Sequence, residues 1–436
     1  MKFLIYAFIA GTLFNCNGIT DELVVKPTQI TTLLEEYPTH ISEELAIIEK
    51  DLKFWKSKLA QNPSGFLYAE KISSALDERF RLKGDIEDID SSNQYLKQAI
   101  GLRNGWKTNN IYQDQIANLI KLHRFQDAER LCVERLNEQP RNLGFQLQFF
   151  DVLMELGKYE DAQRLLVQIS KSNHGFDVII RQAKLFDYLG RLDRTLELMA
   201  KADSMAMKST NPTLKAWTKT IYGEYLTHSG AIASAYKQFM LALQLDPSQE
   251  YAWLNIAWIA YSHDNNQVLY ERILSTLNVK STPDLLWELA QLYKDQGDQR
   301  YHRRIKDFYD IARQPKYQLW YGPKLIEIEG EHLGNHLKAC QMARKEVENR
   351  PTLEAYDGLS WSLYQAGKFD SAKMIYENHL FKKTTEPLIQ YHGSEIYLKT
   401  KDIGKAKGLL AEASEARFEL GPAIFKRIDQ LSNQIP

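Results

Sequence analysis

Hydrophobic residues recur along most of the chain at intervals of three and four residues, in short segments separated by turns. In LSWSLYQAGKFDSAKMIYENHL, residues 359–380, two such amphipathic segments are joined at Gly367. This spacing places the apolar side chains on one face of a helix. No stretch alternates apolar and polar residues for long enough to indicate a strand. The pattern predicts an all-α protein built from short helices.

The helical segments repeat with a period near 34 residues. A column of small residues early in every second helix shows this, with intervals of 34, 33, 40, 34, 33, 37, 33 and 34 residues: Ala128, Ala162, Thr195, Ala235, Leu269, His302, Ala339, Ala372 and Ala406. Glycines recur in the turn between the two helices, where a helix C-terminus often needs positive φ. The pattern predicts a helix–turn–helix array. Within it, the interval of 40 predicts a longer loop near residues 205–212, and residues 298–335 fit the columns least well.

The array resembles the tetratricopeptide repeat family. One unit matches the family pattern of the second helix and the proline after it at Ala235, Phe239, Ala242 and Pro247. The resemblance implies a right-handed superhelical solenoid. Lys324 is followed four residues later by Ile328, where the carboxylate clamp of the family has an asparagine, so that clamp is not expected. The expected organisation is a signal peptide at 1–16, a tether at 17–33, an N-terminal capping helix at 34–66, a degenerate repeat at 67–107, about nine repeats over 108–420 and a C-terminal capping helix at 421–436.

The N-terminus reads as an export signal. MKFLIYAFIAGTLFNCNG has one lysine and then an apolar run, from Phe3 to Phe14, that is too short to span a membrane. Leu13-Phe14-Asn15-Cys16 resembles a bacterial lipoprotein box, which implies lipidation of Cys16. The alternative is ordinary signal cleavage after Gly18. Either way we expect an exported protein of the cell envelope; the resemblance favours a lipid anchor in the outer membrane and leaves the periplasmic or surface side open.

The composition limits the classes of partner that we expect. The 55 basic and 56 acidic residues leave a net charge of −1, and no charge block is long enough for phosphate contacts, so no nucleic-acid partner is expected. Only two cysteines remain after Cys16, namely Cys132 and Cys340, too few for a disulfide framework. We expect the membrane to be contacted only through the possible lipid anchor.

A second pattern concerns the helix face that lines the concave groove in the resembling family. Between residues 217 and 391 this face carries many aromatic residues, and the candidate groove residues are Trp217, Tyr251, Trp258, Tyr261, Trp287, Tyr321, Trp361, Tyr364 and Tyr391. These rings could bind an extended peptide, a partner loop or a glycan, because Tyr and Trp supply large contact area at low entropic cost. Alternatively they pack sideways against neighbouring helices.

No catalytic motif, phosphate loop or metal motif is evident, so we expect a non-enzymatic protein without cofactor or metal. His332, His336 and Cys340 are spaced by four residues, but Gly334 breaks the helix between them. The leading hypothesis is an envelope-anchored scaffold or adaptor that binds another protein in its groove. The alternatives are a glycan- or peptide-capture protein and an accessory subunit of an envelope enzyme complex.

Overall fold

The computed structural model describes residues 23–103, 108–278 and 282–435. Helices and turns make up this part of the chain, and no strand occurs in it. None of its helices is both long enough and apolar enough to cross a membrane. The predicted signal segment and Cys16 lie outside the described residues. The all-α fold class expected from the sequence is confirmed.

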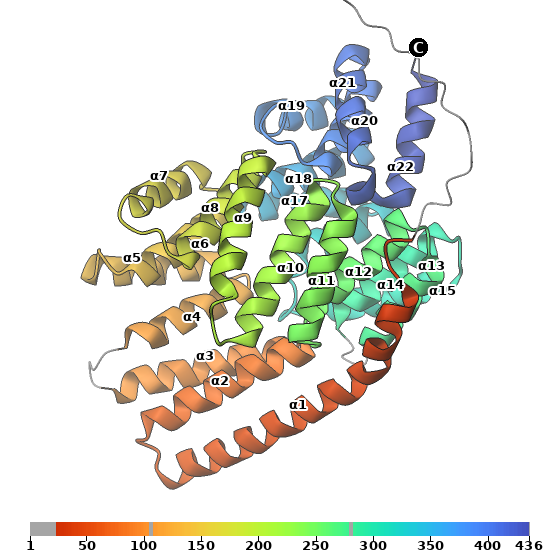
Figure 1. Ribbon diagram of the computed structural model, residues 1–436. Helices are drawn as coiled ribbons and strands as arrows, with labels where there is room; N and C mark the ends of the chain where they lie inside the picture. The colour runs from red at the N-terminus through yellow and green to blue at the C-terminus, as the bar shows by residue number, and fades with distance from the viewer. Residues whose placement is uncertain (1–22, 104–107, 279–281, 436) are drawn as a thin grey trace, which may run out of the picture.

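The helices follow one another as antiparallel pairs after one long N-terminal helix (Figure 1). Their bounds are α1 Pro27–Gln61, α2 Phe66–Lys83, α3 Ile86–Leu102, α4 Asn109–Lys121, α5 Phe125–Glu138, α6 Leu143–Glu155, α7 Tyr159–Ser170, α8 Phe176–Tyr188, α9 Leu192–Ala206, α10 Pro212–His228, α11 Ile232–Leu245, α12 Glu250–Trp258, η1 Ile259–His263, α13 Gln267–Leu277, α14 Pro283–Asp295, α15 Arg300–Ala312, α16 Gly322–Glu327, η3 Ile328–His332, α17 His336–Asn349, α18 Leu353–Gln365, α19 Phe369–His379, α20 Pro387–Lys399, α21 Ile403–Glu415 and α22 Arg417–Gln434. The elements η1 and η3 are single π-helical turns that end α12 and α16. The result is a tetratricopeptide-like solenoid of helix–turn–helix units.

The turn between paired helices is closed by backbone hydrogen bonds that need a left-handed residue. At the end of α6, Gly157 has φ +69°. Its N–H donates to the Met154 carbonyl at 3.1 Å, and the Lys158 N–H donates to the Leu153 carbonyl at 2.9 Å. This is the arrangement in which glycine ends a helix without steric cost. The same left-handed φ recurs at the turn glycines predicted from the sequence: Gly190, Gly230, Gly297, Gly334 and Gly367.

The small-residue column is buried where paired helices touch, with one exception. Its alanines are 0% exposed, as at Ala162 and Ala372. His302 is exposed instead, and the buried residues of α15 are Ile305, Phe308 and Ala312. The sequence register was therefore wrong for α15, which begins three residues after its turn glycine, Gly297, rather than two.

The interval of 40 residues is absorbed by helices rather than by a loop. The helices α9 and α10 are 15 and 17 residues long, and only residues 207–211 separate them. Pro212 begins α10 at a position where its missing N–H has no helical partner to lose. The predicted long loop near 205–212 was therefore wrong.

The long helix α1 starts earlier than expected, and the segment before it contacts the middle of the array. Residues 27–33, expected in the tether, already belong to it. Before it, the N–H groups of Val24 and Val25 donate to the carboxylate of Asp264 at 3.1 and 2.8 Å. Because Asp264 follows η1, the start of the described chain is fixed to a unit about 240 residues away.

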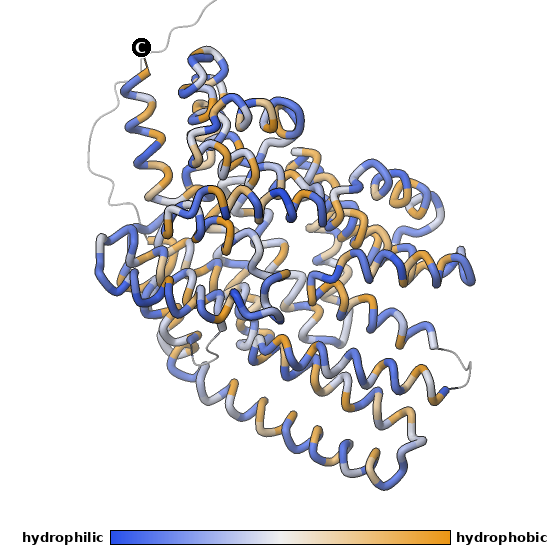
Figure 2. Tube along the Cα trace, turned by 180° about the vertical axis from the view of Figure 1, so that it is seen from behind, coloured by the Kyte–Doolittle hydropathy of each residue, from blue (hydrophilic) through white to orange (hydrophobic). Residues whose placement is uncertain are grey.

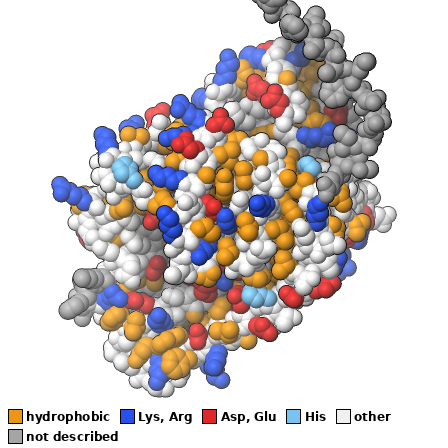
Figure 3. Space-filling view, viewed as in Figure 1, with side chains coloured by type: hydrophobic (Ala, Val, Ile, Leu, Met, Phe, Trp, Pro, Cys, Tyr) orange, Lys and Arg blue, Asp and Glu red, His pale blue; other side chains and the backbone are white. Residues whose placement is uncertain are grey.

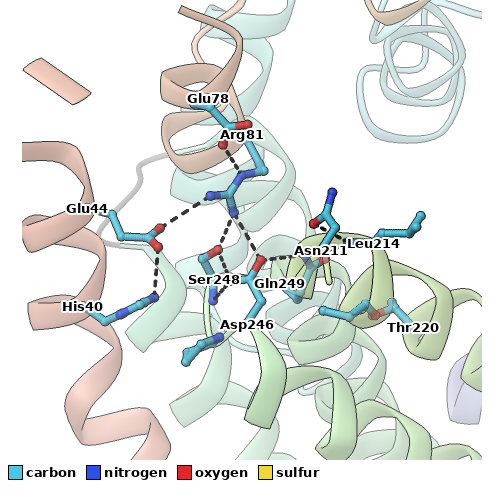
Figure 4. Close-up of polar contacts among 12 residues, drawn as sticks. His40, Glu44, Glu78, Arg81, Asn211, Leu214, Thr220, Asp246, Ser248 and Gln249 are labelled. Atoms are coloured by element: carbon cyan, nitrogen blue, oxygen red, sulfur yellow. Dashed lines mark hydrogen bonds and ion pairs between the residues drawn. The ribbon is translucent and has the colours of Figure 1, made fainter. Parts of the chain in front are cut away.

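A polar network fixes α1 and α2 to the turn after α11 (Figure 4). The guanidinium of Arg81 lies 3.5 Å from Glu44 of α1 and 3.6 Å from Asp246. It also donates a hydrogen bond to Ser248, whose hydroxyl donates to Asp246. These contacts are between residues that no sequence periodicity brings together.

The units wind so that early repeats lie against late ones. Gln126 of α5 donates to the Asn349 carbonyl at 3.1 Å, and Gly157 lies against the carbonyl of Pro351. Gly190 is in the same way next to Thr385. Seen from behind, hydrophobic and hydrophilic residues alternate along the helices, as expected for amphipathic helices (Figure 2). The solenoid therefore winds tightly enough for its early and late units to touch, and side chains partly fill its inner face.

Candidate functional site

The first helices of successive units form the inner face of the array, and the predicted groove residues lie on it. In this part of the chain the first helices are α10, α12, α14, α16, α18 and α20. Their exposure falls into three groups. Trp217 and Tyr251 are 37% and 45% exposed. Trp258, Trp361 and Tyr364 are half-buried. The other four are buried, with exposures between 3% and 8%: Tyr261, Trp287, Tyr321 and Tyr391.

The buried tyrosines are held by carboxylates. The Tyr321 hydroxyl donates to Asp284 of α14 at 2.9 Å, and the Tyr261 hydroxyl donates to Asp295. In both pairs the tyrosine and the carboxylate belong to neighbouring units, which couples those units through the inner face. Burial raises the pKa of Tyr261 well above its usual range, so the ring stays neutral. These rings are dry and fixed in the free protein and cannot be ligand anchors without local opening.

The C-terminal segment occupies the inner face at η1. The Phe418 carbonyl accepts hydrogen bonds from Trp258 Nε1 at 3.0 Å and from the Ser262 hydroxyl at 2.8 Å. It enters this position because α22 starts at Arg417 and bends at Gly421, where φ is +71° and ψ is 172°. The expected capping helix at 421–436 thus covers more than the last unit, and Trp258 is satisfied by the chain itself.

A second aromatic and polar group surrounds Trp361. Its ring stacks on Tyr364 at 4.7 Å and on His392 at 4.0 Å between ring centroids. Its Nε1 donates to Glu331 at 2.8 Å. His392 is 8% exposed and its Nδ1 lies 2.9 Å from Asp357. Burial opposes the charged form of His392, but the Asp357 carboxylate outweighs it and raises the pKa of the imidazole.

Next to Trp361 three possible metal ligands meet. One ligand atom from each of Glu327, Glu331 and His332 lies within 4.8 Å of the others. The sequence reasoning placed Ile328 on the inner face, yet Ile328 is 1% exposed in the core and Glu327 takes that place. The difference arises because η3 inserts one extra residue into the helical turn. No spacing rule for a regular helix would have found this group.

The cysteines give no support for a nucleophilic site. Cys132 and Cys340 are both buried and free. Burial raises the pKa of the Cys132 thiol to about 12 and also raises that of Cys340. The thiolate is the reactive form, so both residues act as small apolar side chains.

The outer face is mixed in charge. Lys and Arg side chains alternate with Asp and Glu over the view in Figure 3, and hydrophobic side chains gather near its centre. A cavity of about 780 Å³ lies between α1 and α11 and is bordered by Leu33, Tyr236 and Met240. Nothing in the described structure indicates what would cover this cavity.

Comparisons with known proteins add little to this description. No family model and no curated protein matches the chain. Among solved structures it is similar to yeast Tom70, with 12% identity over 94% of this chain and 97% of that chain, at a TM-score of 0.35. It is also similar to the APC/C hetero-tetramer Cut9-Hcn1, with 13% identity over 86% of this chain and 95% of that chain, at a TM-score of 0.34. Because these scores are low, the fold is assigned from the helix pairs themselves, and neither neighbour carries an argument about function.

One pH effect follows from His228 at the end of α10. Burial alone would lower the pKa of His228, but its hydrogen bond to Asp187 and the charges of Glu419 and Glu224 raise it to about 9. A raised histidine pKa stabilises the fold fully below the unfolded value near 6.5, and the stabilisation is lost as pH rises through about 9. The side chain is 33% exposed, so solvent screening leaves about 1 kcal/mol.

We therefore expect the free energy of unfolding to fall by about 1 kcal/mol more in the wild type than in His228→Gln between pH 6.5 and 9. Urea unfolding at several pH values measures this. His174→Gln is a control outside the cluster. Parallel pH profiles for the wild type and His228→Gln would contradict the expectation.

Proposed function

We propose that this chain is a non-enzymatic scaffold of the bacterial cell envelope that binds an extended segment of a partner protein on its inner face. The observation that carries the proposal is the exposure of Trp217 and Tyr251. They lie near the starts of α10 and α12, the first helices of neighbouring units. Exposed rings on neighbouring units of a solenoid are typical anchors for a partner, because they bury large area with little loss of side-chain freedom.

The two rings are partly pre-positioned. Trp217 meets Phe176 of α8 edge-on, with 6.4 Å between ring centroids. The Tyr251 hydroxyl donates to Glu224 of α10. Rings that are already oriented lose less entropy when a partner binds. The buried rings behind them supply stability and stay outside the contact.

A cross-linked pull-down from native envelopes tests this proposal. It compares the wild type with Trp217→Ala/Tyr251→Ala, after both have been shown to melt at similar temperatures. The matched control is Val268→Ala/Leu337→Ala, because these side chains are 81% and 66% exposed and lie on the second helices α13 and α17. We expect one protein to co-purify with the wild type and the control and to be lost from the ring variant. A partner retained by the ring variant would contradict the proposal.

We also propose that Cys16 carries the lipid anchor. Asp264 holds Val24 and Val25. Val25 lies nine positions after Cys16, so the chain between them reaches at most about 30 Å. The array would then stay close to the membrane surface. Detergent phase partitioning of the wild type and Cys16→Ala tests the anchor. Partitioning of both into the aqueous phase would instead support cleavage after Gly18.

A further inference from the structure

The π-turn η3 brings three side chains to one face of the chain. The Leu333 N–H donates to the Ile328 carbonyl at 2.9 Å, five residues back. The corresponding turn of an α-helix contains one residue fewer. In the π-turn, residues i+4 and i+5 therefore both lie on the same side of the helix as residue i. Glu327, Glu331 and His332 stand in this relation. π-turns of this kind are frequent at functional sites, which makes this face a place to look for a ligand.

His332 is aimed at the two carboxylates. Its side chain is 5% exposed, and its Nδ1 is hydrogen-bonded to the hydroxyl of Tyr301 in α15. Its Nε2 is buried without a hydrogen-bond partner among the described residues and lies 3.9 Å from Glu327 Oε1. A buried polar atom left unpaired costs about 1–3 kcal/mol, so it calls for an explanation.

Glu331 is oriented by two donors from α18. Trp361 Nε1 and Gln365 Nε2 both donate to Glu331 Oε1, at 2.8 and 3.0 Å. The other oxygen, Oε2, has the ammonium of Lys294 at 3.6 Å. Outer hydrogen bonds that fix a carboxylate and an imidazole are the usual support of metal ligands.

We propose that Glu327, Glu331 and His332 bind a divalent transition-metal ion, for which Zn²⁺ is the suitable probe. Imidazole nitrogen together with carboxylate oxygen suits such ions better than Mg²⁺ or Ca²⁺. Tetrahedral coordination at about 2.0–2.2 Å places ligand atoms roughly 3.3 Å apart, so the ligand atoms, now within 4.8 Å, must move together. Glu331 is exposed, so a fourth coordination position stays open to solvent.

The other π-turn among the described residues, η1, supports this assignment. At the positions of η1 that correspond to the three ligands stand Trp258, Ser262 and His263. Two of these bind the Phe418 carbonyl of the chain itself. At η1 this backbone geometry therefore places side chains that bind one common group, the Phe418 carbonyl. At η3 the same geometry places two carboxylates and an imidazole at the corresponding positions.

Isothermal titration of the full chain with Zn²⁺, purified without a histidine tag and freed of metal, tests the proposal. We expect one ion per chain. Glu331→Gln is expected to bind about tenfold or more weakly, and it retains the acceptor for Trp361. The matched control His263→Gln changes the corresponding histidine of η1 and is expected to bind as the wild type does. Glu327→Gln provides a second ligand variant in case the first melts differently.

Two further measurements separate this site from other sources of binding. Lys294→Met removes the competing ammonium and is expected to tighten Zn²⁺ binding. Co²⁺ bound to the wild type should show no thiolate charge-transfer band, because Cys132 and Cys340 are not ligands. The proposal is overturned if the wild type does not saturate with Zn²⁺ or if both carboxylate variants bind it as tightly as the wild type. A thiolate band would overturn it as well.

Discussion

Gly421→Ala is expected to release α22 from the inner face of the array. Gly421 has φ +71° and ψ 172°, a region of backbone conformation that only glycine adopts readily. An added Cβ would also lie 2.7 Å from Cη2 of the Trp258 ring. That ring cannot retreat, since its Nε1 is bonded to the Phe418 carbonyl. Backbone strain costs about 1–3 kcal/mol, and the clash adds a comparable cost.

Thermal unfolding and limited proteolysis would show this release. We expect a lower Tm, new cleavage near the start of α22 and a changed fluorescence of Trp258. Gly358→Ala is the control, because a Cβ at Gly358 in α18 meets nothing within 4 Å. If Gly421→Ala and the control resist protease equally, the bend at Gly421 does not hold the C-terminal helix in place.

Gly393→Ala is expected to destabilise the protein although it improves helix propensity. Gly393 lies inside α20, where alanine would normally stabilise by about 0.5–1 kcal/mol. Here the Cβ would fall 2.1 Å from Cζ of Tyr376, a fully buried ring that meets Tyr397 edge-on at 5.8 Å. Overpacking of this kind costs about 1–3 kcal/mol.

Gly408→Ala in α21 is the matched comparison. A Cβ there meets nothing within 4 Å, so the propensity gain should appear alone, as an increase in stability. Denaturant unfolding of the two variants is expected to give changes of opposite sign. Changes of the same sign would mean that the packing of Tyr376 against α20 is not the reason why position 393 requires glycine.

The aromatic pattern of the inner face has more than one meaning in the structure. Tyr261 and Tyr321 hold units together, and Trp258 holds the C-terminal segment. Only Trp217 and Tyr251, among the predicted groove residues, are exposed enough to anchor a partner in the described fold. A sequence stripe cannot separate these uses, because a helical wheel shows the direction of a side chain and not what lies opposite it.

The sequence by itself determined the repeat. The 34-residue period and the turn glycines follow from local physics: one apolar stripe per helix and a left-handed residue at each helix end. These constraints act over a few residues, so Ala162 and Gly157 could be placed without a structure. The N-terminal export signal remains a prediction from sequence, because it lies outside the described residues.

Only the tertiary structure decided what depends on distant contacts or on one inserted residue. The π-turn at η3 moves Glu327 to the inner face in place of Ile328 and brings it beside His332. The later start of α15 buries Ile305 and exposes His302. The docking of Phe418 on Trp258 joins residues 160 positions apart. Such features are set by packing between units, where the cost of an irregular turn is offset by contacts that periodicity does not encode.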